Sequence, residues 1–469
     1  AGETKRCSPT LLTAHEGDWR AAFAIYKKWL DSWYRPYKCQ NKQWYRECFW
    51  LLAEITDFFE TKEFTKFPIW YDSKTDHFNF LDIMEEQKRL TGYYPDILHL
   101  WAWTYREDLG EPQWGNFGDA DYELYGGLEH FRAALQEVRE KTGKQVSLYL
   151  HPTLLSECYP QAKEFFPKLR VINDQGQMIS INGDSFRMCH ANERWRDFAV
   201  SMYPKIYGDL GIPILYVDEF SLRIENRCYA EGHGHCVPSN LLKTDRDFIT
   251  QLKDAMPEEV ILYGEYAPVD INARYIDCNI SYSYLDAIVD IIETAWRADD
   301  GDDRLSRIYV DTYRFAFPGL VQLVLPMAMR NLSWHPQKFF FFNGTAIYDS
   351  FWDIEESAGH AFTIRAYELK KKYADCFTSD HPQTMIDTLT PVICANRYPG
   401  KKRTLYTLYN RGYNTFRGKF LRVPHKTGNS YYDAWNEQAL DVEIHDGHAV
   451  LSITMDAMQM GCVVVNEAE

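Results

Sequence analysis

The stretch Ile212–Phe220 reads IPILYVDEF, an apolar run that ends in two adjacent carboxylates, Asp218 and Glu219. Val260–Tyr266, which reads VILYGEY, repeats this pattern after a helix-like segment and ends in Glu265. Parallel strands covered on both faces are continuous apolar runs, and in a (β/α)8 barrel the residues at their carboxyl ends point into the active site. The two strands therefore predict a catalytic carboxylate pair. The alternative is that each acid caps the following helix or pairs with an arginine.

The rest of the chain alternates strand-like and helix-like segments in the same way. Its 469 residues can hold a barrel and one smaller domain. We predict an α/β fold: an N-terminal amphipathic helical segment packed on the barrel (1–44), a (β/α)8 TIM barrel (45–377) and a C-terminal antiparallel β-sandwich (378–469). The expected barrel strands are 49–56, 96–105, 145–151, 213–218, 259–265, 275–282, 307–311 and 338–343.

Composition narrows the class of partner. Aromatic residues make up 16% of the chain, and because aromatic faces stack on sugar rings this surplus favours carbohydrate. The net charge of −16 argues against nucleic acid, whose phosphates are bound by clustered Lys and Arg. The sequence has no apolar run of about 18 residues, so we expect no membrane span. The expected partner is an oligosaccharide, polysaccharide or glycoconjugate substrate, and the oligomeric state stays open.

The eleven cysteines are an odd number, so they cannot all form intramolecular disulfides. They leave the compartment open, with a secreted or periplasmic location favoured. The chain starts without Met or a signal-peptide core, so we expect a processed or excised form of the protein.

One loop gathers two cysteines and two histidines: Cys228, His233, His235 and Cys236. Such a loop can hold a disulfide or a two-Cys, two-His zinc ion, but its spacing matches no standard zinc motif. Free thiols beside substrate-facing or structural histidines are the favoured interpretation. We therefore expect no metal and no cofactor.

Other polar and aromatic residues fall at the predicted strand ends. Trp101 and Trp103 alternate along the second strand and share a face, which is either a sugar platform or core. His151, which ends the third strand, either binds sugar hydroxyls or is a core histidine. Glu219 points away from Asp218 if the strand continues, so its alternative is a buried salt bridge. The candidate substrate-binding residues are Trp101, Trp103, His151, Arg187, Glu219, His233, His235, Tyr282 and Asn343.

The carboxylates suit retaining glycoside hydrolysis, which needs two carboxyl groups about 5 to 5.5 Å apart. Adjacent barrel strands lie about 4.8 Å apart and can supply that separation. We assign Asp218 as the nucleophile, with Arg187 as a candidate donor that keeps it ionised, and Glu265 as the acid/base. Asp311 is the third catalytic candidate, stabilising positive charge in the transition state unless it pairs with Arg314.

This pattern resembles the retaining α-glycosidase barrels of the α-amylase kind, in which Asp ends strand four, Glu ends strand five and Asp ends strand seven. Asp218, Glu265 and Asp311 match those three positions. Two departures are Tyr216, where the α-amylases have Arg, and Val310, where they have His. The resemblance implies a covalent glycosyl-enzyme intermediate and an α-linked sugar as substrate.

A closer likeness is to the endo-α-N-acetylgalactosaminidase-like barrels and a related, poorly characterised bacterial family. It covers residues 15 to about 375, and such proteins commonly have a further β-sandwich before the helix. Two rival functions remain: a β-glycosidase that uses Glu219 as acid and Asp311 as nucleophile, and a non-catalytic carbohydrate-binding barrel. The residues that carry the likeness are Gly17–Arg20, Tyr26, Trp29, Asp218, Glu219 and His233–His235.

Overall fold

The structure is a computed structural model that falls into two units, residues 1–35 and 36–469, each described by itself. No helix in the described part of the chain is long and apolar enough to cross a membrane. The described residues are 10, 12–38, 42–54, 71–72, 74–100, 103, 122–157, 159, 161–181, 185–220, 226–280, 312–324, 346–350 and 358–468.

The first unit contains the amphipathic helix α1 (Trp19–Trp33). Asp18 caps it, because its side chain accepts a hydrogen bond from the backbone N–H of Arg20 at 2.9 Å. Residues three and four apart share one helix face, and here they are aromatic. That the helix packs on the barrel stays a prediction. Consecutive ring centroids lie 5.2 to 6.5 Å apart along Trp19, Phe23, Tyr26, Trp29 and Trp33.

The second unit begins with the predicted closed parallel barrel. Each strand pairs with the one before it in the barrel, and the last pairs with the first. This order is the one expected when every strand is followed by a helix that returns the chain to the same end. The eight barrel strands are β1 (Trp50–Glu54), β4 (Ile97–Leu100), β5 (Gln145–Leu148), β9 (Ile214–Val217), β10 (Ile261–Gly264), β11 (Cys278–Ile280), β12 (Val321–Val324) and β13 (Ala346–Ser350).

The first six strands lie within the predicted ranges, but the last two do not. The seventh strand of the closed barrel is β12 and the eighth is β13, so both begin after the predicted ranges 307–311 and 338–343 have ended. The predictions that Asp311 ends strand seven and Asn343 ends strand eight are therefore wrong. Asp311 and Asn343 themselves lie outside the described residues.

Alternate residues of the barrel strands fill its interior. Tyr149, Tyr216 and Tyr263 belong to one buried cluster with apolar residues of the neighbouring strands. His99 lies among them, with its Nδ1 2.5 Å from Ser147 Oγ and 2.6 Å from Tyr263 Oη. Burial lowers the pKa of His99 to about 3, so this layer is neutral at physiological pH.

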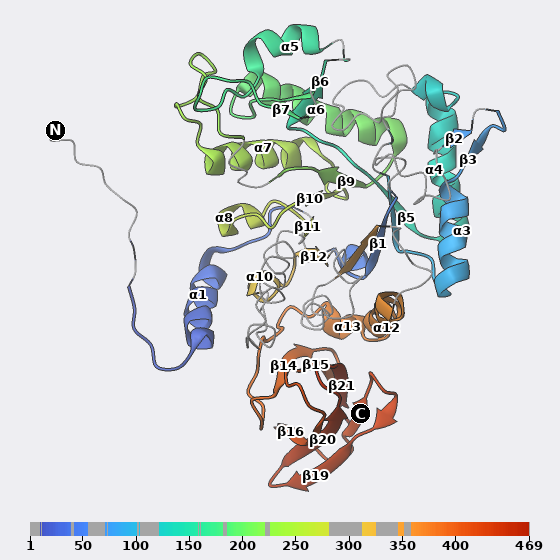
Figure 1. Cartoon of the computed structure of the whole chain (residues 1–469), viewed down its shortest axis with the longest axis vertical. Coiled ribbons are helices and arrows are strands. Elements are labelled where there is room, and N and C mark those ends of the chain that lie inside the picture. Colours follow the sequence, from blue (N-terminus) through green and yellow to red (C-terminus); the bar gives the residue numbers. More distant parts are fainter. Residues whose placement is uncertain are drawn as a thin grey trace, which may run out of the picture. The chain divides into compact units, whose positions relative to one another are not determined.

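Helices surround the strands, and α6 and α7 lie along the side where β9 and β10 run (Figure 1). The left-handed Gly92, Gly143 and Gly211 end three of them, as expected of helix C-caps. The helices that the structure describes in this unit are α2 (Gln43–Arg46), α3 (Phe80–Thr91), the 3-10 helix η2 (Tyr122–Tyr125), α4 (Leu128–Thr142), α5 (Ala162–Leu169), α6 (Glu193–Leu210), α7 (Leu241–Ala255), α8 (Asp270–Ala273), α10 (Thr312–Ala316), α12 (Ala358–Lys372) and α13 (Ala374–Phe377).

Within the described residues, the chain before the C-terminal strands also forms two small antiparallel sheets outside the barrel. One pairs β2 (Tyr71–Asp72) with β3 (His77–Phe78). The other belongs to the long connection between β5 and α6, where β8 (Ser185–Arg187) pairs with β6 (Leu154–Ser156) and β7 (Ser180–Ile181). This second sheet places Arg187 opposite Leu154.

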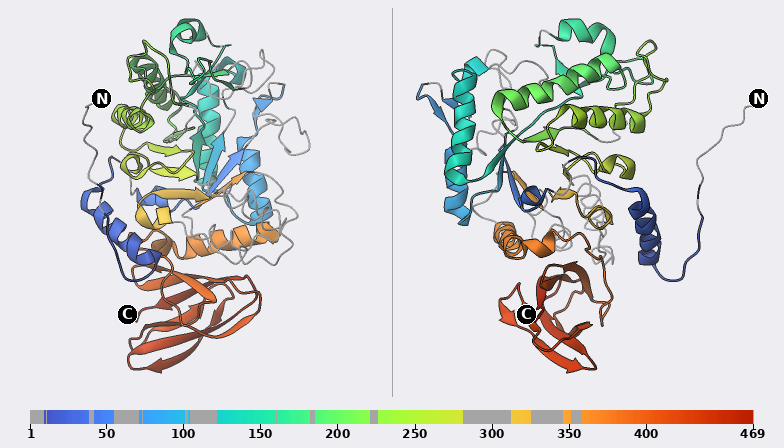
Figure 2. Two further views of the ribbon diagram at one scale, coloured as in Figure 1. Left: turned by 60° about the vertical axis from the view of Figure 1, so that its left-hand side comes forward. Right: turned by 180° about the vertical axis from the view of Figure 1, so that it is seen from behind.

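The C-terminal strands form the predicted sandwich, in which a five-stranded and a three-stranded antiparallel sheet enclose one apolar core (Figure 2). Arg365 of α12 bonds to this part of the chain, donating to the carbonyls of Ala434 and Trp435 at 2.7 and 3.0 Å. The strands are β14 (Ile393–Pro399), β15 (Arg403–Asn410), β16 (Phe416–Pro424), β17 (Ser430–Asp433), β18 (Gln438–Ala439), β19 (Asp441–His445), β20 (His448–Met455) and β21 (Met460–Asn466).

Gly264 at the end of β10 tests how tightly the barrel wall is packed. A Cβ added there would lie 2.9 Å from Ile276 Cδ1 and 3.2 Å from Phe220 Cδ1, and both side chains are buried. Gly264→Ala should therefore lower the free energy of unfolding by about 1–3 kcal/mol, measured by urea denaturation. The control is Gly208→Ala in α6, where nothing lies within 4 Å and a gain of about 0.5–1 kcal/mol is expected. Equal stability of the two variants would contradict this packing.

Candidate active site at the ends of β9 and β10

Asp218 and Glu265 follow two strands that pair in parallel. The register joins Tyr216 to Tyr263 and Val217 to Gly264, so each acid lies one residue beyond the last paired position. The two tyrosines belong to the interior cluster, and side chains two residues apart along a strand share a face. The strands therefore deliver both acids to the interior side at the same end of the barrel. Asp218 and Glu265 are only 6% and 7% exposed.

The Asp218 carboxylate faces two side chains from the end of β5. Tyr149 donates a hydrogen bond from Oη to Asp218 Oδ2 at 2.5 Å, and His151 Nε2 lies 3.2 Å from the same oxygen. Burial raises the pKa of Asp218 above its ordinary value, and the nearby Glu219 adds to the rise. His151 and the tyrosine hydrogen bonds act in the opposite direction. Asp218 is thus a destabilised carboxylate, as functional sites commonly contain.

Glu219 leaves the strand. Its φ of +52° is a left-handed conformation that turns the chain directly after Asp218. Its carboxylate accepts from both terminal nitrogens of Arg187, one at 2.8 Å, and from Thr153 Oγ1 at 2.9 Å. The side chains of Arg187 and Glu219 are 5% and 8% exposed. The salt-bridge interpretation of Glu219 therefore describes the structure.

Arg187 does not donate to the nucleophile candidate as predicted. Its guanidinium is occupied by Glu219 and by Asn226, whose Oδ1 accepts from Nη1 at 2.9 Å. Tyr149 and His151 take the place that was expected for it beside Asp218. The strand alternation that predicted His151 also contains Tyr149, two residues earlier on the same face, and could have identified it. Thr153 and Asn226 lie in connections and carry no such signal.

Trp103 is not a sugar platform. The side chain is 1% exposed, its Nε1 donates to the carbonyl of Tyr149 at 2.8 Å, and its ring stacks on Phe131 of α4. The strand ends at Leu100, so the alternation that was expected to place Trp103 in the lumen no longer applies there. Trp101 and Tyr282 lie outside the described residues.

His233 and His235 lie with Cys189 and Cys228 in one cluster. Cys236, which was considered as a disulfide partner of Cys228, is exposed, and its Sγ donates instead to the carbonyl of Pro238 at 3.4 Å. The cluster therefore contains Cys189 in place of the predicted Cys236. Cys189 lies far before this loop in the sequence, so the local spacing could not reveal it.

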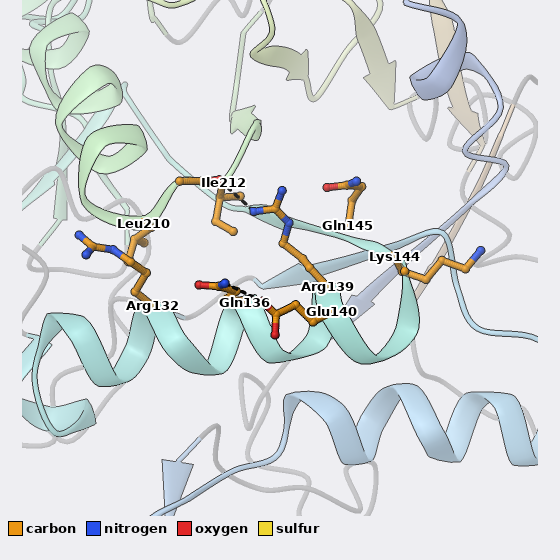
Figure 3. Close-up of a pocket in the computed structure, with 10 residues that line it drawn as sticks. Arg132, Gln136, Arg139, Glu140, Lys144, Gln145, Leu210 and Ile212 are labelled. Carbon is orange, nitrogen blue, oxygen red and sulfur yellow. Dashed lines mark hydrogen bonds between the residues drawn. The ribbon is translucent and has the colours of Figure 1, made fainter.

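A cavity of about 450 Å³ lies at the other end of the barrel (Figure 3). Arg132, Gln136 and Arg139 of α4 line it, together with Gln145 at the start of β5 and Ile212 just before β9. Active sites of this fold occur at the carboxyl ends of the strands, so this cavity is not the candidate site.

We compared the chain with known protein families, curated proteins and solved structures. Residues 8–240 match the model of a domain of unknown function, DUF6259. The sequence has no significant match among curated proteins. Among solved structures, a noncanonic maltogenic α-amylase from Thermotoga neapolitana is 12% identical with a TM-score of 0.59, and covers 90% of this chain and 99% of its own. The fold is similar to that of α-amylases.

Two further structures agree. An α-amylase from Geobacillus thermoleovorans, complexed with acarbose, is 8% identical with a TM-score of 0.57 over 90% of this chain and 99% of its own. A debranching enzyme from Nostoc punctiforme is 12% identical with the same TM-score over 92% of this chain and all of its own. At these identities the likeness shows a shared fold alone, a (β/α)8 barrel followed by a β-sandwich.

Removing one member of the Arg187–Glu219 pair should destabilise the fold more than removing both. Arg187→Ala leaves a buried carboxylate without its cation and should lower the free energy of unfolding by about 3–5 kcal/mol. Replacing both residues, as Arg187→Met with Glu219→Leu, should recover most of that loss because no buried charge remains. Denaturant unfolding of the wild type, the single variant and the double variant measures both changes. Arg194→Ala is the control: its bond to Glu164 is solvent-exposed, so a change within about 0.5 kcal/mol is expected.

The raised pKa of Asp218 predicts the pH dependence of an Asp218→Asn variant. A folded-state pKa above the unfolded value means that stability falls as pH rises from the unfolded pKa to the folded one. Asparagine carries no charge, so this variant should melt at a higher temperature than wild type at pH 7. The gain should vanish near pH 3, where Asp218 is protonated in both states.

An opposite-sign control is Asp254→Asn. Hydrogen bonds from Lys38 and Tyr37 lower the pKa of Asp254, so its loss should destabilise slightly at pH 7 and not at pH 3. Thermal melts at both pH values measure the two effects. An Asp218→Asn variant that melts below wild type at pH 7 would show that the carboxylate is stabilised by its neighbours.

Proposed function

We propose that the protein is a retaining glycoside hydrolase that acts on an α-linked sugar, with Asp218 as nucleophile and Glu265 as acid/base. The observation that carries the proposal is the register of β9 and β10, which presents the two acids from adjacent strands at one end of the barrel. Adjacent strands lie about 4.8 Å apart, close to the carboxylate separation of retaining enzymes. We expect the two carboxyl groups within about 4.5 to 7 Å of each other.

The fold supports a carbohydrate substrate. The similar structures include α-amylases and a debranching enzyme, and one of the α-amylases is complexed with acarbose. Fold alone does not carry an activity, because one barrel serves many reactions. The two strand-end acids supply the chemical argument that the fold lacks.

The neighbours of Asp218 suit a nucleophile. Attack on the anomeric carbon requires the ionised carboxylate, and the hydrogen bond from Tyr149 stabilises that form. The same bond holds one oxygen, Oδ2, together with His151 Nε2 at 3.2 Å. A buried, destabilised carboxylate loses less solvation when it forms the ester.

Glu265 completes the reaction. It protonates the glycosidic oxygen as the bond to the leaving group breaks, while Asp218 forms the glycosyl ester. Ionised Glu265 then takes a proton from water, which attacks the same carbon and releases Asp218 and a sugar of unchanged anomeric configuration. Asp311 lies outside the described residues, so its role as a third catalytic carboxylate stays a prediction, and the two-carboxylate scheme does not depend on it.

The rival functions have less support. A β-glycosidase that uses Glu219 as its acid would need a proton on a carboxylate that already accepts from Arg187 and Thr153. Those donors favour the ionised form, which cannot donate to a leaving group. A non-catalytic binding protein would leave Glu265 without a task. Activity measurements separate these alternatives.

The two roles predict different defects. Asp218→Ala should abolish formation of a glycosyl-enzyme with every substrate. Glu265→Ala should slow hydrolysis of poor leaving groups by about 10²- to 10⁴-fold, yet still form the intermediate from glycosyl fluorides or dinitrophenyl glycosides. Azide should then accelerate the Glu265 variant and yield the α-azide. Intact-protein mass spectrometry detects the intermediate, and NMR assigns the anomer of the product.

The control is Asp254→Asn, because Asp254 is half-exposed at the end of α7 and should leave turnover unchanged. A panel of aryl α- and β-glycosides supplies the substrates. Azide rescue of the Asp218 variant alone would reverse the two assignments. Full activity of both variants would rule out this site.

A further inference from the structure

Four side chains from two connections meet beside the candidate active site. Cys189 follows β8, whereas Cys228, His233 and His235 belong to the loop between β9 and α7. One ligand atom of each residue lies within 4.8 Å of those of the other three. Cys189 Sγ is 3.3 Å from His235 Nε2, and Cys228 Sγ is 3.5 Å from His233 Nδ1.

We propose that Cys189, Cys228, His233 and His235 bind one structural zinc ion. Two thiolates and two imidazoles are a standard zinc ligand set. With Zn–S and Zn–N bonds of about 2.3 and 2.0–2.1 Å, the ligand atoms of a tetrahedron lie roughly 3.3–3.8 Å apart. Two of the four sulfur–nitrogen distances, 3.3 and 3.5 Å, fall within that range, and because all the ligand atoms lie within 4.8 Å of one another, movements of about 1 Å close the site.

The second ring nitrogen of His235 supports this assignment. Its Nδ1 lies 2.8 Å from the carbonyl oxygen of Cys236, and a carbonyl only accepts, so Nδ1 carries the proton. The Nε2 lone pair then faces Cys189 Sγ and is free to coordinate. A backbone carbonyl behind a ligating imidazole is a usual arrangement at zinc sites.

The loop is shaped to bring its two histidines to one point. Gly232 and Gly234 flank His233 with φ of +85° and +78°, a conformation that side-chain-bearing residues rarely adopt. Asn192 donates from Nδ2 to the carbonyl of His233 at 3.0 Å. Cys228 is held by a bond between its backbone N–H and Ser239 Oγ at 2.9 Å. The ligands are thus positioned by bonds that do not depend on the ion.

A disulfide between Cys189 and Cys228 is the main competing state. It would use both sulfurs but would give no role to the imidazole that faces each of them. Both cysteines are buried, while a cavity of about 690 Å³ that both histidines line offers an entry path for an ion.

Four protein ligands fill a tetrahedron, so the proposed zinc is structural and leaves no position for a substrate. Its place in the chain suggests its effect. Cys189 lies two residues after Arg187, and Cys228 lies two residues after Asn226. Arg187 Nη1 donates a hydrogen bond to Asn226 Oδ1 at 2.9 Å. The ion would join the two connections that hold the Arg187–Glu219 pair beside Asp218, whether or not the barrel is a glycosidase.

Metal content of the purified full-length chain tests the proposal. Plasma mass spectrometry should find about one zinc per chain when no chelator is used, and Cys189→Ser and His235→Ala should remove most of it. Cys236→Ser is the matched control, because Cys236 belongs to the same loop but lies outside the cluster. Loss of zinc in that control, or none in the other two, would overturn the ligand assignment.

Because a ligand variant can fail to fold, the unaltered chain is tested as well. After removal of metal with a chelator under reducing conditions, cobalt(II) should restore the melting temperature and give the intense visible bands of a tetrahedral site with thiolate charge transfer. Absence of those bands, or a mass deficit of about 2 Da with a linked peptide containing Cys189 and Cys228, would overturn the proposal in favour of free thiols or a disulfide.

Discussion

The parallel pairing of β9 with β10 is the constraint on which the candidate site depends. Side chains alternate between the two faces of a strand, so a register slip of one residue would turn one acid away from the lumen. The buried rings of Tyr216 and Tyr263 prevent that slip, because they fill the interior two residues before Asp218 and Glu265. The acids are therefore positioned by the core of the barrel, and not by the loops that follow them.

Burying the two carboxylates of Asp218 and Glu219 close together costs solvation free energy. Their surroundings compensate for this cost in two different ways. Glu219 is paired with a bidentate arginine and a hydroxyl, which together give both of its carboxylate oxygens a donor. Asp218 has a tyrosine and a histidine on one oxygen, and its pKa remains raised. Under the proposed function, this difference distinguishes a structural acid, Glu219, from the nucleophile, Asp218, although the two are adjacent in sequence. Functional residues are commonly retained even where they lower the stability of the fold.

The local sequence pattern correctly predicted the barrel strands that precede the two candidate acids. The runs before Asp218 and Glu265 are apolar, bounded and followed by acids, and both are barrel strands. The run 307–311 looked equally strand-like, but β12 begins at Val321, because short apolar runs carry no information on which of them pairs. The partners of Arg187 and the contribution of Cys189 depend on how a long connection folds back, which spacing along the chain does not express.

The two connections that fold back need polar links because they have little core of their own. The buried cluster between them consists of Val171, Cys189 and Cys228, far smaller than the core of the barrel. Few apolar contacts mean that such segments open at low cost unless something else joins them. The ion pair of Arg187 with Glu219 is one such link. The proposed zinc site joins the same two connections and would be a second link. A rigid barrel supplies the acids, and the polar links between its loops keep their surroundings in place.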